Sequence, residues 1–236
     1  MRTTPRIVEE QILRWQMLHR EPEEKKASMT ITISRDPGSG GRIIAEKLAE
    51  KLGFQVFQRE VLHAMAKDAD VSEYLLNTLD EKGLSVLEDW ISSLIYERHL
   101  WPDQYLRHLM KVVGAIGKHG RAVIVGRGAN FILPPEKQFR VRITAPQKLR
   151  IEHVAHHFNV PKEEAKRRVI RTESDRRAFI RKYFNSDIGD PINYDLTLNT
   201  EILSVDNAVN VVSAALGCVV ECKIDETEQS HLLTYA

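Results

Sequence analysis

The chain has 236 residues, 28% of them charged, and its formal net charge is +1 at pH 7. This length allows one α/β domain with appendages and a substantial buried core. The balanced charge argues against nucleic acid or an anionic membrane as a partner, and no stretch approaches the roughly eighteen apolar residues of a membrane span.

The cellular compartment is expected to be the cytoplasm. The first residues, "MRTTPRIVEEQ", bring acidic and polar groups too early for a secretory signal. Cys218 and Cys222 are too few for a disulfide framework and lack a second pair of ligands for zinc.

The N-terminal segment 1–28 is predicted to be a helical appendage followed by a linker. Val8, Ile12, Trp15 and Leu18 form one helical stripe, and the proline and charge run of "EPEEKKAS" then breaks it. This helix would pack either on the main domain or on a second subunit, as a homodimer contact.

From residue 29 onward, predicted strands alternate with predicted helices, which indicates an α/β fold with a parallel sheet. The strands are expected at 30–34, at 54–57, within "RAVIVGRGAN", at 139–145 and at 194–200. The helices are expected at 42–52, across about 60–119, in "APQKLRIEHVAHHF", in "VPKEEAKRRVIRTESDRRAFIRKYF" and in "SVDNAVNVVSAALG". Ser204 is the expected N-cap of the last helix and Gly217 its end, which leaves 218–236 as a loose polar tail.

A glycine-rich loop lies between the first predicted strand and the first predicted helix. Gly38, Gly40 and Gly41 fall within four positions of "DPGSGG". A phosphate needs several backbone N–H groups that converge on one point, and only glycine lets the backbone come that close. The context therefore predicts phosphate binding, with a tight turn that holds no ligand as the alternative.

The loop lacks the lysine and the hydroxyl residue that phosphate loops of this type carry, because Gly41 and Arg42 stand in those places. The guanidinium of Arg42 could hold phosphate oxygens with two parallel hydrogen bonds. A hydroxyl normally takes one position on Mg²⁺, so Ser39 or the carboxylate of Asp36 is the candidate to replace it.

Arginines elsewhere in the chain are the next candidates for an anion site. Arg127, between two glycines in "VGRGAN", follows a buried strand, where open α/β sheets bind ligands. A surface ion pair is the alternative for this residue.

The basic segment "RTESDRRAFIRKYF" could close over phosphates as a mobile cover. Arg171, Arg176, Arg177 and Arg181 would provide the charge, and Asp175 would hold Arg171 in place from one helical turn away. The alternatives are a solvated charged face and a nucleic-acid patch, although aromatic residues are sparse for the latter.

Two other patterns have structural alternatives that we favour. The histidines of "HVAHH" could bind a metal, but no acidic or cysteine partner is near, so a surface helix is expected. Trp101 and Tyr105 could form a pocket wall, but their spacing fits packing residues of a helix.

The order of these motifs resembles the cytidylate kinase-like family of P-loop proteins over about residues 29–217. The motifs are the phosphate loop, a helical insertion, "VIVGRGA", an arginine-rich segment with Asp-Arg, and "YDLTLNT". The form "SRxxGSGGR" of the loop is itself typical of that branch. The resemblance implies a three-layer fold of the nucleoside monophosphate kinase type, with a five-stranded parallel sheet. It also implies a helical acceptor-binding region at about 60–119 and an arginine lid at about 158–190.

The resemblance also implies roles for individual residues. Gly38, Ser39, Gly40 and Gly41 would hold the phosphates of ATP, with Arg42 beside them, and Arg127 would bind the acceptor phosphate. Arg171 and the Asp175-Arg176 pair match part of the lid motif. A later lid arginine is replaced by Ala178, and Arg177 or Arg181 could serve instead.

Two positions depart from true cytidylate kinases. Gly128 stands where they have an acid that helps to read the cytosine nucleotide, and Gln58 stands where they have an aspartate. The sequence thus supports two hypotheses. One is a phosphotransferase that uses ATP and Mg²⁺ on a nucleoside monophosphate. The other is a non-catalytic nucleotide-binding module whose N-terminal helix and tail engage a protein partner.

Overall fold

Five short strands form a parallel sheet in the order β2-β3-β1-β4-β5. The computed structural model describes residues 29–233, so the appendage predicted at 1–28 lies outside the described residues. The strands are β1 (Thr30–Arg35), β2 (Gln55–Phe57), β3 (Ala122–Val125), β4 (Gln138–Thr144) and β5 (Leu196–Asn199). The predicted α/β fold with a five-stranded parallel sheet is confirmed.

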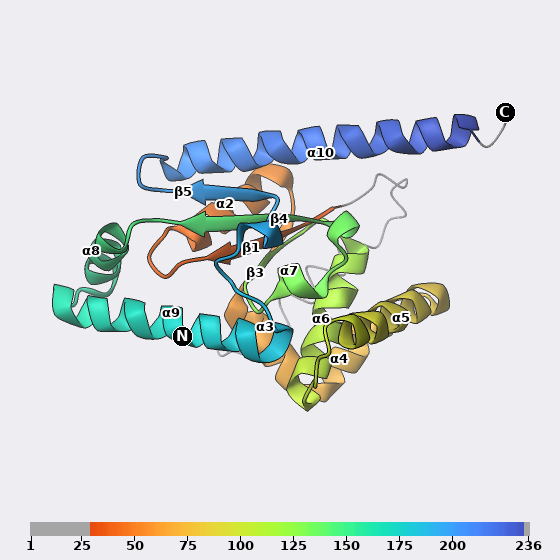
Figure 1. Ribbon diagram of the computed structural model, residues 1–236, viewed down its shortest axis with the longest axis horizontal. Helices are drawn as coiled ribbons and strands as arrows, with labels where there is room; N and C mark the ends of the chain where they lie inside the picture. The colour runs from red at the N-terminus through yellow and green to blue at the C-terminus, as the bar shows by residue number, and fades with distance from the viewer. Residues whose placement is uncertain (1–28, 234–236) are drawn as a thin grey trace.

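Helices cover both faces of the sheet, and β2 and β3 carry apolar residues on both of their sides. Ile31 and Ile33 of β1 join one core with α2 and α10, whereas Phe57 and Ile124 join a second core with α3, α6 and α7. Figure 1 shows α10 above the sheet and α9 below it. The helices of the described residues are α2 (Gly41–Leu52), α3 (Arg59–Lys67), α4 (Ala69–Leu76), α5 (Glu81–Glu97), α6 (Gln104–His119), α7 (Ala129–Ile132), α8 (Gln147–Phe158), α9 (Lys162–Phe184) and α10 (Val205–Leu233), with short 3₁₀ turns at Pro135–Lys137 and Pro191–Asn193.

The region 60–119 is helical, as predicted, and consists of most of α3 together with α4, α5 and α6. One expectation there is wrong: Trp101 is 95% exposed and does not pack. Helix α6 begins only at Gln104, after its N-cap Asp103, so Trp101 lies in the preceding loop. The helical spacing between Trp101 and Tyr105 therefore does not apply.

The C-terminal helix α10 continues well beyond its predicted end. Ser204 does cap it, since its Oγ accepts a hydrogen bond from the N–H of Asn207 at 3.2 Å. Gly217, however, lies inside the helix, and the chain remains helical to Leu233. A glycine ends a helix when it takes the left-handed conformation, as Gly53 does after α2 with φ 65°. Gly217 keeps a negative φ, so the predicted loose tail at 218–236 is wrong up to residue 233.

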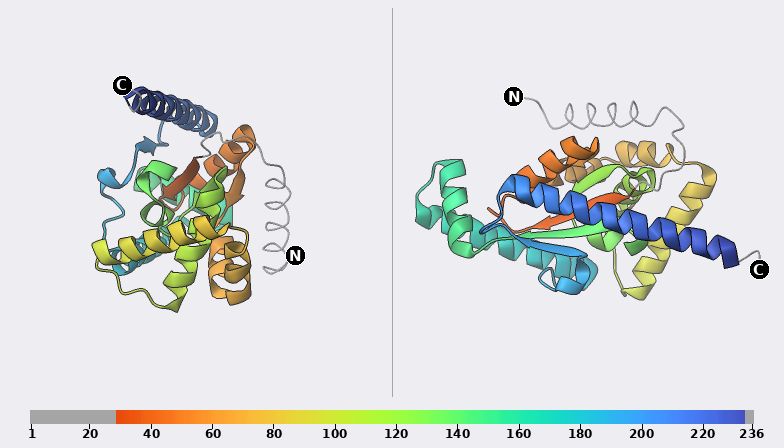
Figure 2. Two further views of the ribbon diagram at one scale, coloured as in Figure 1. Left: turned by 90° about the vertical axis from the view of Figure 1, so that its right-hand side faces the viewer. Right: turned by 90° about the horizontal axis from the view of Figure 1, so that it is seen from above.

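Figure 2 shows the far end of α10 projecting past the sheet. Among residues 29–233, no helix combines the length and the apolar character that crossing a lipid bilayer would require.

Candidate functional site

The loop between β1 and α2 lies at the carboxyl ends of the central strands, and side chains of other elements donate hydrogen bonds to its carbonyl groups. Its glycines Gly38 and Gly40 have left-handed φ angles of 83° and 77°. Three carbonyl oxygens, one at the end of β1 and two in the loop, accept hydrogen bonds from side chains of other elements: Arg35 O from Arg176 Nη1 (2.7 Å), Gly38 O from His153 Nδ1 (2.9 Å) and Ser39 O from Thr200 Oγ1 (2.9 Å).

The amide groups of the same loop are free. Within the described part of the chain, the N–H groups of Gly38, Gly40, Gly41 and Arg42 have no hydrogen-bond acceptor. The first bond of α2 runs from Ile44 N to Gly40 O at 3.1 Å. Several unpaired N–H groups at the positive end of a helix are what an anion such as phosphate requires.

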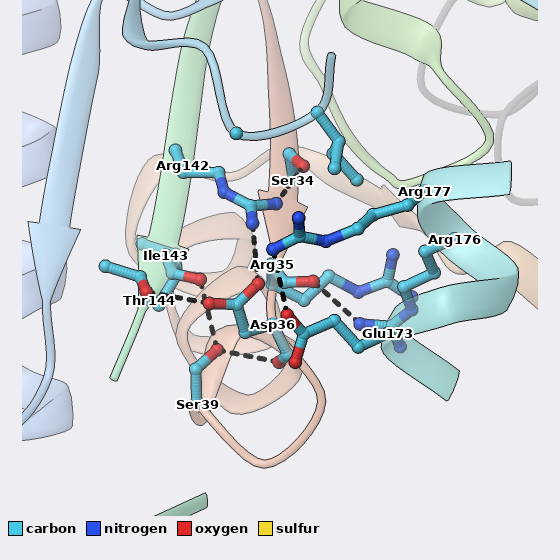
Figure 3. Close-up of polar contacts among 12 residues, drawn as sticks. Ser34, Arg35, Asp36, Ser39, Arg142, Ile143, Thr144, Glu173, Arg176 and Arg177 are labelled. Atoms are coloured by element: carbon cyan, nitrogen blue, oxygen red, sulfur yellow. Dashed lines mark hydrogen bonds and ion pairs between the residues drawn. The ribbon is translucent and has the colours of Figure 1, made fainter. Parts of the chain in front are cut away.

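The two side chains that the sequence offered to Mg²⁺ are both engaged within the protein (Figure 3). Ser39 is buried, and its Oγ donates to the carbonyl oxygens of Asp36 (2.9 Å) and Ile143 (3.2 Å). The carboxylate of Asp36 accepts from Arg142 Nη2 at 2.6 Å and from Thr144 Oγ1 at 2.7 Å. These bonds hold the loop on β4, and the burial of Ser39 and the enclosure of the Asp36 carboxylate limit the access of a metal ion to their oxygen atoms.

Beside the loop lies a cavity of about 120 Å³ that four arginines line. These are Arg35, Arg59, Arg127 and Arg176, and Asp175 also reaches the wall. Glu60, a carboxylate that acts on these arginines, is bonded to Arg59 at 3.0 Å. The cavity is therefore strongly positive, which suits a ligand with more than one negative charge.

Burial and mutual repulsion act on these guanidinium groups. Burial, with Arg176 and Arg59 nearby, lowers the pKa of Arg35 to about 9. Burial, with Arg59, lowers the pKa of Arg176 to about 10, and the pKa of Arg127 is lowered chiefly by burial. At these values Arg35 and Arg176 remain charged at pH 7. The Nε atoms of Arg127 and Arg176 are buried without a hydrogen-bond partner, so an anion in the cavity would find donors available.

The sequence Gly126-Arg127-Gly128 places its arginine over this cavity through an unusual backbone. All three residues have positive φ angles, 79°, 55° and 69°. The guanidinium of Arg127 lies 5.3 Å from the centre of the Phe179 ring of α9, in a cation–π contact. The prediction that Arg127 points into the crevice at the strand ends agrees with this geometry.

A second, more open pocket of about 490 Å³ meets the arginine cavity at Arg127 and Phe179. Tyr105 and Tyr183 line it with His63 and His108. Burial and the charge of Arg127 lower the pKa of His63, so its ring is neutral at pH 7, and its Nδ1 lies 3.1 Å from the Tyr105 hydroxyl. Tyr105 thus belongs to a pocket wall as well as to the core.

Helix α9 directs the predicted lid residues to different places. Asp175 and Arg176 face the arginine cavity, whereas Arg177 and Arg181 line a separate hollow of about 630 Å³. Arg177 is bonded to Glu173 at 3.0 Å (Figure 3). Successive helical residues are about 100° apart, so one helix cannot aim all of them at one ligand.

Two expectations about arginine side chains do not match this structure. Arg42 is exposed, and its Nε is bonded to Glu46 at 3.1 Å, one turn along α2 and away from the loop amides. Among the described residues, no hydrogen bond or ion pair joins Arg171 to Asp175, although they are one turn apart. In an exposed helix such a contact is weakly favourable and is readily lost to water.

The sequence reasoning missed Arg35, Arg59 and His153. Arg35 is the last residue of β1 and Arg59 the first of α3, directly after β2. The strand-end rule that selected Arg127 would have selected Arg35 if the first strand had been extended by one residue. The sequence offered His153 only as a possible metal ligand and gave no sign of its contact with Gly38, which depends on how α8 packs against the loop.

A model of the cytidylate kinase-like family matches residues 30–202. The chain belongs to the cytidylate kinase-like family. The match includes the loop, the four arginines of the cavity and α9, and it ends before α10.

Several curated relatives of this family member are named cytidylate kinase. That of Desulfurococcus amylolyticus is 29% identical over 195 residues, which cover 82% of this chain and 95% of the relative. That of Natronomonas pharaonis is 30% identical over 197 residues, which cover 80% and 89%. Among solved structures, an uncharacterized protein from Eubacterium ventriosum has a TM-score of 0.59 at 22% identity, and the alignment covers 79% of this chain and 96% of that one. The last comparison shows the fold alone.

Proposed function

We propose that the protein is an ATP-dependent phosphotransferase that acts on a nucleoside monophosphate. The observation that carries this proposal is the continuous arrangement of three parts: free loop amides, a cavity lined by four arginines, and an aromatic pocket. The names of the curated relatives support the same reaction class. The loop would hold the triphosphate of ATP, the arginines the acceptor phosphate, and the aromatic pocket the rest of the acceptor.

The proposed transfer needs positioning and charge neutralisation more than acid–base chemistry. An ionised oxygen of the acceptor phosphate forms a bond to the γ-phosphorus of ATP. The bond from that phosphorus to the β–γ bridging oxygen breaks, and the electron pair leaves with ADP. Arg127 and Arg176 would hold the acceptor oxygens close to the γ-phosphoryl group and offset their negative charge.

Mg²⁺ usually accompanies ATP in such transfers and offsets charge on the β- and γ-phosphates. Within residues 29–233, no group of three or more His, Cys, Asp or Glu side chains could hold a metal ion. Because Ser39 is buried and the carboxylate of Asp36 is enclosed with Arg142, we propose that phosphate oxygens and water are the main ligands of the ion. Asp175 is the carboxylate that reaches the cavity, so it is the side chain best placed to touch that shell.

We propose that this site does not read cytosine in the way that the resemblance to cytidylate kinases implies. A side chain at position 128 would overlap the ring of Phe184, so no acid could stand there in this packing. Gln58 donates to Glu46 at 3.1 Å on the exposed surface. The acceptor base would instead be read by the histidine and tyrosine side chains of the aromatic pocket.

A non-catalytic nucleotide-binding module remains the second candidate, and the enclosure of Ser39 and Asp36, which limits their access to a metal ion, favours it. Incubation of the protein with ATP, Mg²⁺ and a panel of nucleoside monophosphates, read by product mass, separates the two. Turnover of any acceptor supports the enzyme. Absence of turnover together with thermal stabilisation by ATP supports the module.

The role of Arg127 gives a sharper test. We expect Arg127→Ala to raise the acceptor KM by about ten- to a hundredfold, as befits one charged hydrogen-bonding group, and to leave ATP binding nearly intact. Steady-state kinetics against each substrate, together with calorimetry of ATP binding, provides the measurement. Equal losses for both substrates would contradict this role.

A further inference from the structure

The glycine at position 41 is the starting point, because it stands where comparable loops carry a lysine. A Cβ built on Gly41 would lie 2.6 Å from Cβ and 3.1 Å from Cγ of Arg35. Real side-chain atoms do not approach so closely, so the stem of Arg35 already fills the space that a residue at position 41 would need. A lysine at position 41 and an arginine at position 35 therefore could not both fit in this packing.

The charged end of Arg35 lies between the loop and the acceptor side of the site. Its Nη1 is so close to Gly126 that a Cβ there would overlap it. Gly126 directly follows β3, whose register with β1 pairs Ile33 with Val125. The side chain thus crosses from the end of β1 to the end of β3. There it lines the arginine cavity, between the glycine-rich loop and Arg127.

The guanidinium of Arg35 is available to a ligand. Among the described residues, it donates no hydrogen bond to any side chain or carbonyl group, although the backbone oxygen of Arg35 accepts from Arg176. The carboxylate with the largest effect on it, Glu60, is bonded to Arg59. Burying a cation partly, without a bonded anion and among three like charges, costs free energy. A bound anion would offset that cost.

Resting on the phosphotransferase proposed above, we infer that Arg35 supplies the loop cation that a lysine at position 41 would otherwise supply. It would touch the γ-phosphoryl group during transfer, from the floor of the site between the loop amides and Arg127. Arg42, which the sequence favoured for this role, instead lies on the outer face of α2 with Glu46. Arg35 is thus a further catalytic residue, and Gly41 and Gly126 are small because Arg35 passes beside them.

The first test compares Arg35→Met with Arg167→Met, an exposed arginine of α9 outside the cavities, in the full-length protein. We expect Arg35→Met to lower kcat by about 10²- to 10³-fold, the cost of losing one group that binds transition-state charge, while the acceptor KM changes much less. Arg167→Met should match the wild type. Equal kcat values for Arg35→Met and Arg167→Met would overturn the inference and leave the proposed function intact.

The second test moves the cation to the other end of the loop. Arg35→Gly empties the space beside Gly41, so the pair Arg35→Gly/Gly41→Lys restores the usual arrangement. We expect the kcat of this pair to be at least about tenfold higher than that of Arg35→Gly. The kcat of Arg35→Lys should lie between those of Arg35→Met and the wild type. If Arg35→Met fails to fold by circular dichroism, these variants decide, and no recovery in a folded pair overturns the inference.

A binding measurement separates failure of this inference from failure of the proposed function. Calorimetry with the β,γ-imido analogue of ATP and Mg²⁺ needs no turnover. If the wild type transfers no phosphoryl group but binds the analogue at least tenfold more tightly than Arg35→Met does, the phosphate contact of Arg35 stands and the phosphotransferase falls. If both proteins bind it equally and kcat is also equal, the inference falls.

Discussion

At the scale of single residues, the ion pair of Asp36 and Arg142 is the most consequential contact under the loop. Their side chains are only 12% and 10% exposed, and Arg142 also donates to Ser34 Oγ at 2.8 Å (Figure 3). An enclosed carboxylate is tolerated only while its donors remain. The pair therefore fixes where the loop leaves β1.

We expect Arg142→Met to lower the free energy of unfolding by about 3–5 kcal/mol, because it leaves the Asp36 carboxylate enclosed with Thr144 as its remaining side-chain donor. Urea denaturation followed by circular dichroism gives the value. The matched control is Arg168→Met, which removes an exposed pair with Glu164 and should change stability by less than about 0.5 kcal/mol. Similar losses in the two variants would mean that the Asp36 pair is not enclosed in solution.

Single residues also mark the limit of what the sequence reveals about the site. Arg127 could be predicted because four apolar residues lead directly into it, which identifies a strand end. Arg35 ends a strand in the same way. The prediction instead chose Arg42, because Arg42 directly follows Gly41, where such loops carry a lysine. Which side chain fills a vacant space depends on packing between β1 and α2, and local sequence does not encode that directly.

At the scale of elements, helix α9 is fixed to the sheet along its second half. Arg176 bonds to the end of β1, and Phe184 packs against Gly128 and stacks on Phe131 of α7 with ring centres 5.4 Å apart. Its first half instead shares a small core with α8 through Ala165 and Val169. A lid motion would therefore involve α8 and the first half of α9 together.

The junction of Gly128 and Phe184 can be tested directly. We expect Gly128→Ala to lower the free energy of unfolding by about 2–4 kcal/mol, because the methyl group overlaps the ring and the backbone stays at φ 69°. The acceptor KM should rise as well, since Arg127 is the preceding residue. Urea denaturation and kinetics provide the two readouts.

Adding Phe184→Leu should return part of the stability lost in Gly128→Ala, because the smaller side chain leaves room for the methyl group. If the second change only adds to the loss, the overlap is not the cause.

Element boundaries were predictable to within one or two residues wherever β-branched runs meet turn residues, as in β1 and β4. The rotation of α9 was not. Its many charged residues give no clear apolar stripe. The packing of Ile180 and Phe184 into the core decides that Arg176 rather than Arg177 faces the cavity. The end of α10 was also missed, because a glycine marks a helix end only when the following chain leaves the helix.

At the scale of the whole molecule, α10 lies beyond the segment that the family match covers, which ends at residue 202, and packs beside α2 on one face of the sheet. Its first turns nevertheless belong to the core. Val212 is fully buried, Lys47 of α2 pairs with Asp206 at 2.6 Å, and Lys51 bonds to Asn210 at 2.7 Å.

Two neighbouring valines test this docking. We expect Val212→Ala to lower the free energy of unfolding by about 2 kcal/mol, because it leaves a cavity against α2 and the sheet. Val211→Ala, at a position 39% exposed, should cost less than about 0.5 kcal/mol. Urea denaturation of both variants measures the difference, and equal values would mean that α10 does not dock as described.

The hydrogen bonds to the loop carbonyl groups bear on the rate at which a nucleotide would associate with the protein. Side chains from α8, from α9 and from the turn after β5 already donate hydrogen bonds to the glycine-rich loop and to the end of β1 in the absence of a ligand. A nucleotide would thus meet a receptor whose shape is set in advance, and little conformational entropy would be lost on association. Encounter with the triphosphate should then be governed by diffusion and charge rather than by rearrangement of the backbone.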